Sequence, residues 1–134
     1  MEMTKKRLEA YRSEKQEIME LRHKLHDLKE EDFTESDVIM DYRSGFPVPQ
    51  SIVGVNVNAY WKRKERLISD ISRLERRCQE TELWIDEIQD SSIRRIFRMY
   101  YEDGQGQQAI ARQLHMDQSM ISRKISRYID ICHG

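Results

Sequence analysis

Glycine and proline are scarce in this chain of 134 residues, which contains five and two of them. Tight turns depend on these residue types, so a compact β-rich fold is disfavoured. Charged residues make up 35% of the chain and hydrophobic residues 38%. This balance favours long, solvent-exposed helices in one or two small domains, and it leaves too little apolar material for the core of a large enzyme.

Cysteine and long apolar runs are also scarce. Cys78 and Cys132 lack the spacing of a CxxC motif and are too few for a disulfide framework, which indicates a reducing compartment. No apolar run approaches the roughly 20 residues needed to span a bilayer, and the first residues contain no apolar segment typical of a secretion signal. We therefore expect a cytoplasmic protein without a membrane association.

Signals of catalysis are missing too. His23 and His26 stand three residues apart in a charged segment, but no further ligand completes a metal site. The sequence contains no glycine-rich phosphate loop and no nucleophile motif. We expect no enzyme activity, no cofactor and no bound metal.

The charges that are present are unevenly distributed, although the formal net charge is only −1. From Ser91 onward the chain has seven basic and four acidic side chains, whereas Glu30–Asp41 has six acidic side chains and no basic one. The C-terminal third is therefore locally basic and the middle of the chain is acidic. The C-terminal third has the sign of charge that a polyanion attracts.

Two long segments have the hydrophobic spacing of a coiled coil, with steps of three, four or seven residues. They cover about Thr4–Glu31 and Ala59–Ile88. The expected seams are Tyr11, Ile18, Leu21, Leu25 and Leu28, with Leu8 beside them, and Leu67, Ile71, Leu74, Cys78, Thr81, Ile85 and Ile88. The pattern predicts an all-α fold with a long antiparallel helical hairpin over residues 1–90. One such pair buries little surface, so a homodimer is expected.

Between the two segments, Gly45, Pro47 and Pro49 interrupt any helix. We expect an irregular connector at about residues 32–58. The alternation of Val53, Val55 and Val57 with polar or small residues favours a short extended stretch within it. The connector is either an interaction loop or a cover over a helix end.

The last third changes its periodicity. Asp90 or Ser91 is placed to cap a helix over about 92–101, and EDGQG ends it. A short helix over Gln107–Leu114 follows, then a bend at His115 and Met116, and a helix from Gln118 to about Tyr128 with Asp117 as its N-cap. The expected buried residues are Ile110, Ala111, Leu114, Met116, Ile121 and Ile125.

This order predicts a helix-turn-helix domain over 91–134. Ala111 is small enough to let the two helices cross closely. The bend position tends to require a positive φ, and histidine at 115 tolerates that region better than most residues.

The polar side of the two short helices is predicted to contact double-stranded DNA. Gln118 and Arg123 are placed to read base edges in the major groove, and Gln107 and Arg112 to contact phosphates. Arg94, Arg95 and Arg98 would extend the phosphate contact. The full predicted set is Gln107, Arg112, Gln118, Ser119, Ser122, Arg123, Lys124 and Arg127.

The stretch IFRMYYEDGQGQQAIARQLHMDQSMISRKISRYI resembles region 4 of bacterial sigma-70-type factors. The same elements follow one another in the same order: a helix ending in two tyrosines, a glycine-containing turn, an AIA-type supporting helix and an ISRKI-type recognition helix. The whole chain is similar to the small sigma-like regulators of Gram-positive phages and prophages, the ArpU and RinA late-gene regulators, and residues 44–47 compare with their connector. The resemblance implies transcriptional control of phage genes, with RNA polymerase as a further partner.

Two alternatives remain open. Small terminase subunits, which recognise DNA for packaging, also combine a helix-turn-helix with oligomerising helices, and they form rings of many subunits. Alternatively, the helices dock on a protein such as RNA polymerase. A salt-dependent affinity for random duplex DNA speaks against a purely protein-binding role.

Overall fold

A computed structural model describes residues 2–41 and 48–133 of the chain. This part is predominantly helical, as predicted. The helices are α1 (Lys5–Asp27), α2 (Val57–Asp86), α3 (Ser91–Phe97), α4 (Gln107–Leu114) and α5 (Gln118–His133), with short helical turns η1 (Glu30–Phe33) and η2 (Arg98–Glu102). No helix within the described ranges is long and apolar enough to cross a membrane.

The connector differs from its prediction, because most of it is regular. Strands β1 (Thr34–Asp41) and β2 (Val48–Val55) form an antiparallel ribbon in which Thr34 lies opposite Val55 and Asp41 opposite Val48. The expected extended stretch lies in β2, but Val57 already belongs to α2. β1 was not foreseen, since its many acidic residues hide its strand character. Residues 44–47, compared above with a phage connector, lie outside the described residues.

The chain divides into two compact units. Unit 1 comprises Met1–Met19 and Ser72–Gly134, and unit 2 comprises Glu20–Ile71. The sequence prediction placed its boundary at residue 90, where the periodicity changes. The packing follows a different division, because the beginning of α1 and the end of α2 share a core with α3, α4 and α5.

The core of unit 1 is built from both long helices and all three short ones. Met3 and Leu8 of the N-terminal segment and Ile85 of α2 pack in one cluster with the C-terminal helices. The other buried members are Ile88, Ile96, Phe97, Tyr101, Ile110, Ala111, Ile121, Ile125 and Ile129. Trp84, which lies outside the predicted seam, packs its ring at 5.9 Å from that of Phe97 and 5.8 Å from that of Tyr128.

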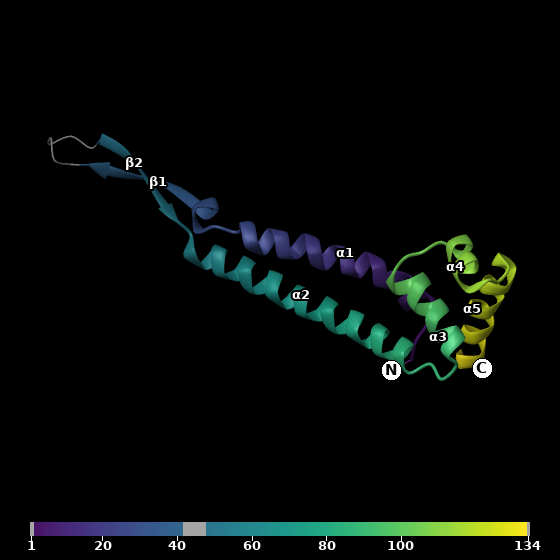
Figure 1. The fold of residues 1–134 in the computed structure, drawn as a ribbon. Helices are drawn as coiled ribbons and strands as arrows, with labels where there is room; N and C mark the ends of the chain where they lie inside the picture. Colours follow the sequence, from purple (N-terminus) through teal and green to yellow (C-terminus); the bar gives the residue numbers. More distant parts are fainter. Residues whose placement is uncertain (1, 42–47, 134) are drawn as a thin grey trace. The chain divides into compact units, whose positions relative to one another are not determined.

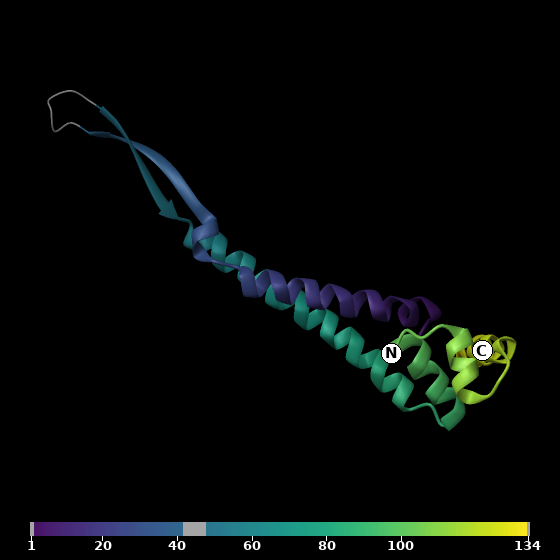
Figure 2. The ribbon, with the colours of Figure 1, turned by 45° about the horizontal axis from the view of Figure 1, so that its top comes forward.

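Within unit 1, the first half of α1 lies along the second half of α2 (Figures 1 and 2). Charged pairs border this contact, with Arg7 at 2.8 Å from Glu80 and Glu14 at 3.1 Å from Arg77. The Tyr11 hydroxyl donates a hydrogen bond to Glu82, and burial raises the pKa of Tyr11. All seven residues of the second predicted seam, from Leu67 to Ile88, are buried, as are Leu8, Tyr11 and Ile18.

Unit 2 contains the remaining parts of α1 and α2 together with η1 and the ribbon. Leu67 and Ile71 are buried there, whereas Leu21, Leu25 and Leu28 are half-buried. The Asn56 side chain accepts a hydrogen bond from the Ala59 N–H at 3.0 Å, which satisfies a free donor in the first turn of α2. Aromatic rings connect η1 to α2, since Phe33 lies 5.9 Å from Tyr60 between ring centroids.

Candidate nucleic-acid interface

A tight turn joins α4 to α5. His115 adopts φ 55° and ψ 46°, a left-handed conformation, and the Met116 N–H donates to the Ala111 carbonyl at 2.9 Å. This hydrogen bond is typical of a Schellman ending, in which a residue of positive φ lets the chain leave the helix. The positive φ expected at His115 is therefore confirmed. The bounds of α4 also agree with the prediction.

The two helices meet over apolar side chains. Ile110 and Ala111 of α4 and Ile121 and Ile125 of α5 are buried, as predicted. Leu114 and Met116 are only partly buried against the same core. α5 is longer than predicted and ends at His133 rather than at about Tyr128. The extra turns add Ile129 to its buried face.

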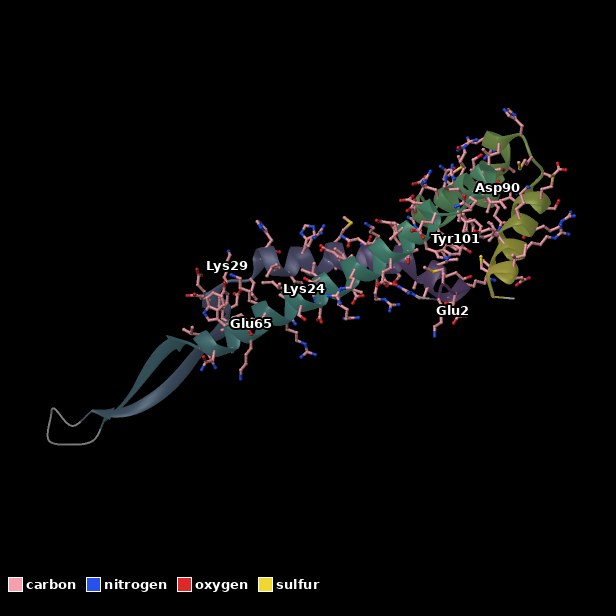
Figure 3. The ribbon with its side chains drawn as sticks, turned by 90° about the horizontal axis from the view of Figure 1, so that it is seen from below. Glu2, Lys24, Lys29, Glu65, Asp90 and Tyr101 are labelled. Carbon is pink, nitrogen blue, oxygen red and sulfur yellow. The ribbon has the colours of Figure 1, made fainter. Side chains whose placement is uncertain are left out.

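The preceding helix holds α4 and α5 in place. The Asp90 carboxylate accepts a hydrogen bond from the Ile93 N–H at 3.0 Å and caps α3, as predicted (Figure 3). α3 continues into η2, whose Tyr101 is buried. Gly104 then turns the chain with φ 68°, a left-handed conformation that glycine adopts without strain.

Three cations share the outer side of α5. Arg123, Lys124 and Arg127, together with Met120, line a shallow hollow of about 190 Å³. The Arg123 guanidinium donates to the Ser119 hydroxyl at 3.2 Å. In the part of the chain that the structure describes, none of the three cations forms an ion pair with a carboxylate. Their charge is thus available to an external anion.

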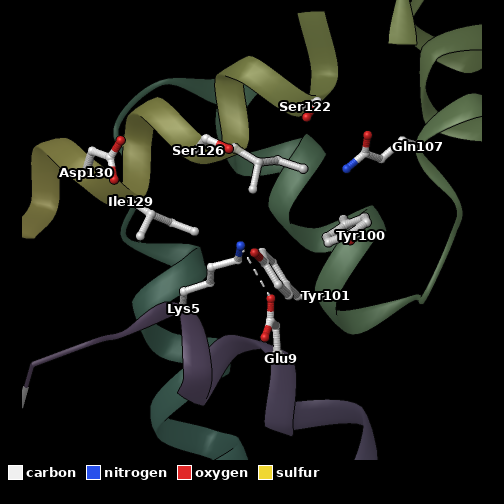
Figure 4. A pocket seen from close by; sticks show the side chains of 10 residues that line it. Lys5, Glu9, Tyr100, Tyr101, Gln107, Ser122, Ser126, Ile129 and Asp130 are labelled. Atoms are coloured by element: carbon white, nitrogen blue, oxygen red, sulfur yellow. Dashed lines mark ion pairs between the residues drawn. The ribbon is translucent and has the colours of Figure 1, made fainter. Parts of the chain in front are cut away.

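The other flank of α5 faces a second hollow. Gln107 of α4 and Ser122 and Ser126 of α5 line a cavity of about 220 Å³ together with Lys5 and Glu9 of α1 (Figure 4). The structure therefore brings two predicted site residues, Gln107 and Ser122, to one cavity.

The remaining predicted contacts are more scattered. Gln118 and Ser119 are exposed at the start of α5. Arg112 is exposed in the last turn of α4 and lines neither hollow.

Two of the three arginines expected to extend the phosphate contact have other partners. Arg94 donates to the Ile88 carbonyl at 2.8 Å, and Arg98 lies 2.9 Å from Asp86 and 3.6 Å from Glu102. These contacts tie α3 and η2 to the segment around the end of α2. Only Arg95 of the three is exposed.

Lys5 and Glu9 were missed at the site, because their spacing marks them only as outer positions of a coiled coil. Met3 and Leu8 could have indicated this contact, because both are apolar and lie outside the predicted α1 seam. Both are buried against the C-terminal helices. Among the described residues, no group of three or more metal-binding side chains is present, and His23 and His26 are exposed on α1.

Comparisons of the chain with models of protein families, with curated proteins and with solved structures gave no match.

Proposed function

We propose that this chain is a sequence-specific, double-stranded-DNA-binding transcription regulator of phage or prophage genes. Helices α4 and α5 act as a helix-turn-helix, and α5 enters the major groove. The geometry of the turn at His115 and the buried row Ile121, Ile125 and Ile129 support this proposal. They leave the opposite side of α5 free for a ligand.

The proposed contacts follow from position along α5. Gln118 and Arg123, near its start, read base edges, because the N-terminal part of a recognition helix reaches deepest into the groove. Lys124 and Arg127 contact phosphates on one flank, and Gln107 does so on the other. Arg112 contributes to the phosphate contact from the end of α4, and Ser119 and Ser122 donate to bases or phosphates.

One observation carries the proposal: Arg123, Lys124 and Arg127 share a surface that has no neutralising carboxylate among the described side chains. A decisive test replaces all three with alanine and measures binding of random duplex DNA by fluorescence anisotropy at several salt concentrations. We expect binding to be weakened at every salt concentration. The slope of log K against log salt should become shallower by about 0.9 for each phosphate that the variant no longer neutralises.

The chain offers a matched control. Lys62, Arg63 and Arg66 are exposed on α2 in unit 2, and their replacement by alanine removes the same number of lysines and arginines. The control variant should retain the slope of the unaltered protein. Equal losses of affinity in both variants, or no salt-dependent binding at all, would contradict the proposal and favour docking on a protein such as RNA polymerase.

A homodimer is part of the proposal, since helix-turn-helix regulators commonly place two recognition helices on two half-sites one helical turn apart. A solution mass distinguishes this assembly from that of a small terminase subunit, for which eight or more copies are expected. Selection of bound sequences from a random DNA pool then tests for the palindrome that a two-fold dimer requires.

A further inference from the structure

We propose that the first turn of α1 belongs to the DNA-binding surface, with Lys5 contacting a phosphate on the Gln107 and Ser122 flank of α5 and the neighbouring Lys6 adding to the positive charge of the turn. This inference rests on the proposed function and adds residues to the same site. It joins the beginning of the chain to a surface otherwise formed by its last third.

Contacts within unit 1 fix the position of this turn. Met3 and Leu8 are buried in the cluster that contains Ile125 and Ile129 of α5. The Thr4 hydroxyl accepts a hydrogen bond from the Arg7 N–H at 3.1 Å, so the helix begins at a defined point. Lys5 is thereby held beside α5 rather than on a free N-terminal arm.

The cavity of about 220 Å³ is where Lys5 meets the proposed DNA contacts. Its lining includes the Lys5 ammonium, the Gln107 amide and the hydroxyls of Ser122 and Ser126 (Figure 4). Ammonium, amide and hydroxyl groups are the side-chain donors that proteins use toward phosphate oxygens. Because three elements supply them, a phosphate at the rim of this cavity would contact α1, α4 and α5 together.

The charges of the turn favour such a contact. Lys5 forms an ion pair with Glu9 at 3.8 Å, and their side chains are 68% and 58% exposed. An exposed pair at this distance is weak, so the ammonium is available to a phosphate. Lys6 is exposed as well, and no ion pair engages it in the described ranges.

Two carboxylates oppose an anion deep inside the cavity, since Glu9 and Asp130 also line it. The phosphate is therefore placed at the open rim, where solvent screens both carboxylates. Neutralising Glu9 should strengthen DNA binding, because it removes the nearest repulsive charge and frees Lys5.

The test compares two double variants of the full chain on random duplex DNA over a range of salt concentrations. Lys5→Gln with Lys6→Gln should weaken binding and make the salt slope shallower by about 0.9 for each phosphate that is no longer neutralised. The control, Lys24→Gln with Lys29→Gln, removes two exposed lysines of unit 2, one in the last turn of α1 and one just after it (Figure 3). It should leave the slope unchanged. Glu9→Gln should increase affinity and steepen the slope.

The outcomes separate this inference from the proposed function. If the variant at residues 5 and 6 binds like the unaltered protein while the triple variant at 123, 124 and 127 fails to bind, the inference is wrong and the proposed function stands. Equal losses of affinity in the test and control pairs would also overturn it, as a general effect of charge. Melting curves show whether the variant at residues 5 and 6 loses affinity because it is less stably folded. If it does, the Glu9→Gln variant, which keeps both lysines, tests the inference: an unchanged affinity would then overturn it.

Discussion

At the scale of single residues, His115 carries the geometry of the proposed interface. It is the one residue other than glycine with a positive φ among the described residues. A left-handed conformation costs an L-residue about 1–2 kcal/mol, a cost that glycine does not incur. Packing of the buried residues of α4 and α5 therefore holds His115 in a backbone conformation that is locally unfavourable.

Replacing His115 with glycine should raise the free energy of unfolding by about 1 kcal/mol, after the extra entropy of glycine in the unfolded chain is counted. Urea denaturation measures this change. Arg112→Gly is the control, since Arg112 is exposed and right-handed in α4. Glycine there should lower stability by about 0.5–1 kcal/mol. A His115→Gly variant destabilised to the same extent would contradict the left-handed conformation of residue 115.

At the scale of elements, η2 ends at a carboxylate in an unfavourable environment. Burial raises the pKa of Glu102 above its ordinary value of 4.5, although Arg98 lowers it. The folded protein therefore favours the protonated form more than the unfolded chain does. The stability that this preference provides is present below the ordinary pKa and is lost as pH rises through the folded-state pKa.

Glu102→Gln should therefore be more stable than the unaltered protein at pH 7, with the difference shrinking as pH falls below about 4.5. Arg98 keeps its contact with Asp86 at 2.9 Å in this variant. Thermal unfolding at both pH values measures the difference. Asp103→Asn, which removes the exposed carboxylate of the next residue, is the comparison variant. A Glu102→Gln variant that is less stable at pH 7 would contradict the expected sign.

The elements also show where local sequence is informative. The bounds of α4 and the buried face of α2 follow from spacing alone, and even Thr81 is buried, its hydroxyl donating to the Arg77 carbonyl at 3.2 Å. The exposed positions of α5 follow from the same periodicity. β1 was not predicted, because its acidic residues are untypical of a strand and it is stabilised by pairing with β2. The partners of Arg94 and Arg98 and the place of Lys5 likewise depend on tertiary contacts.

At the scale of the whole molecule, α2 offers a second apolar face besides its buried seam. Trp61 and Ile68 are 48% and 46% exposed and stand seven residues apart, so they lie on one side of the helix. Val57, one turn before Trp61, is exposed on the same side. Large apolar side chains in a row are typical of surfaces that a partner covers.

We expect this face to contribute to the proposed homodimer, so Trp61→Ser should shift the mass measured by analytical ultracentrifugation from dimer toward monomer. Ile131→Ser is the control, because Ile131 is 74% exposed near the end of α5 and belongs to unit 1. The Trp61 variant should also bind a palindromic site more weakly, because its two half-sites are then bound by separate protomers. The affinity of a single protomer for random duplex DNA should change little. If the unaltered protein has the mass of a monomer at concentrations on the order of tens of micromolar, the dimer is contradicted, whereas the proposed DNA contacts of α5 are not. Eight or more copies would instead favour the ring of a small terminase subunit, in which the same helices would serve DNA packaging.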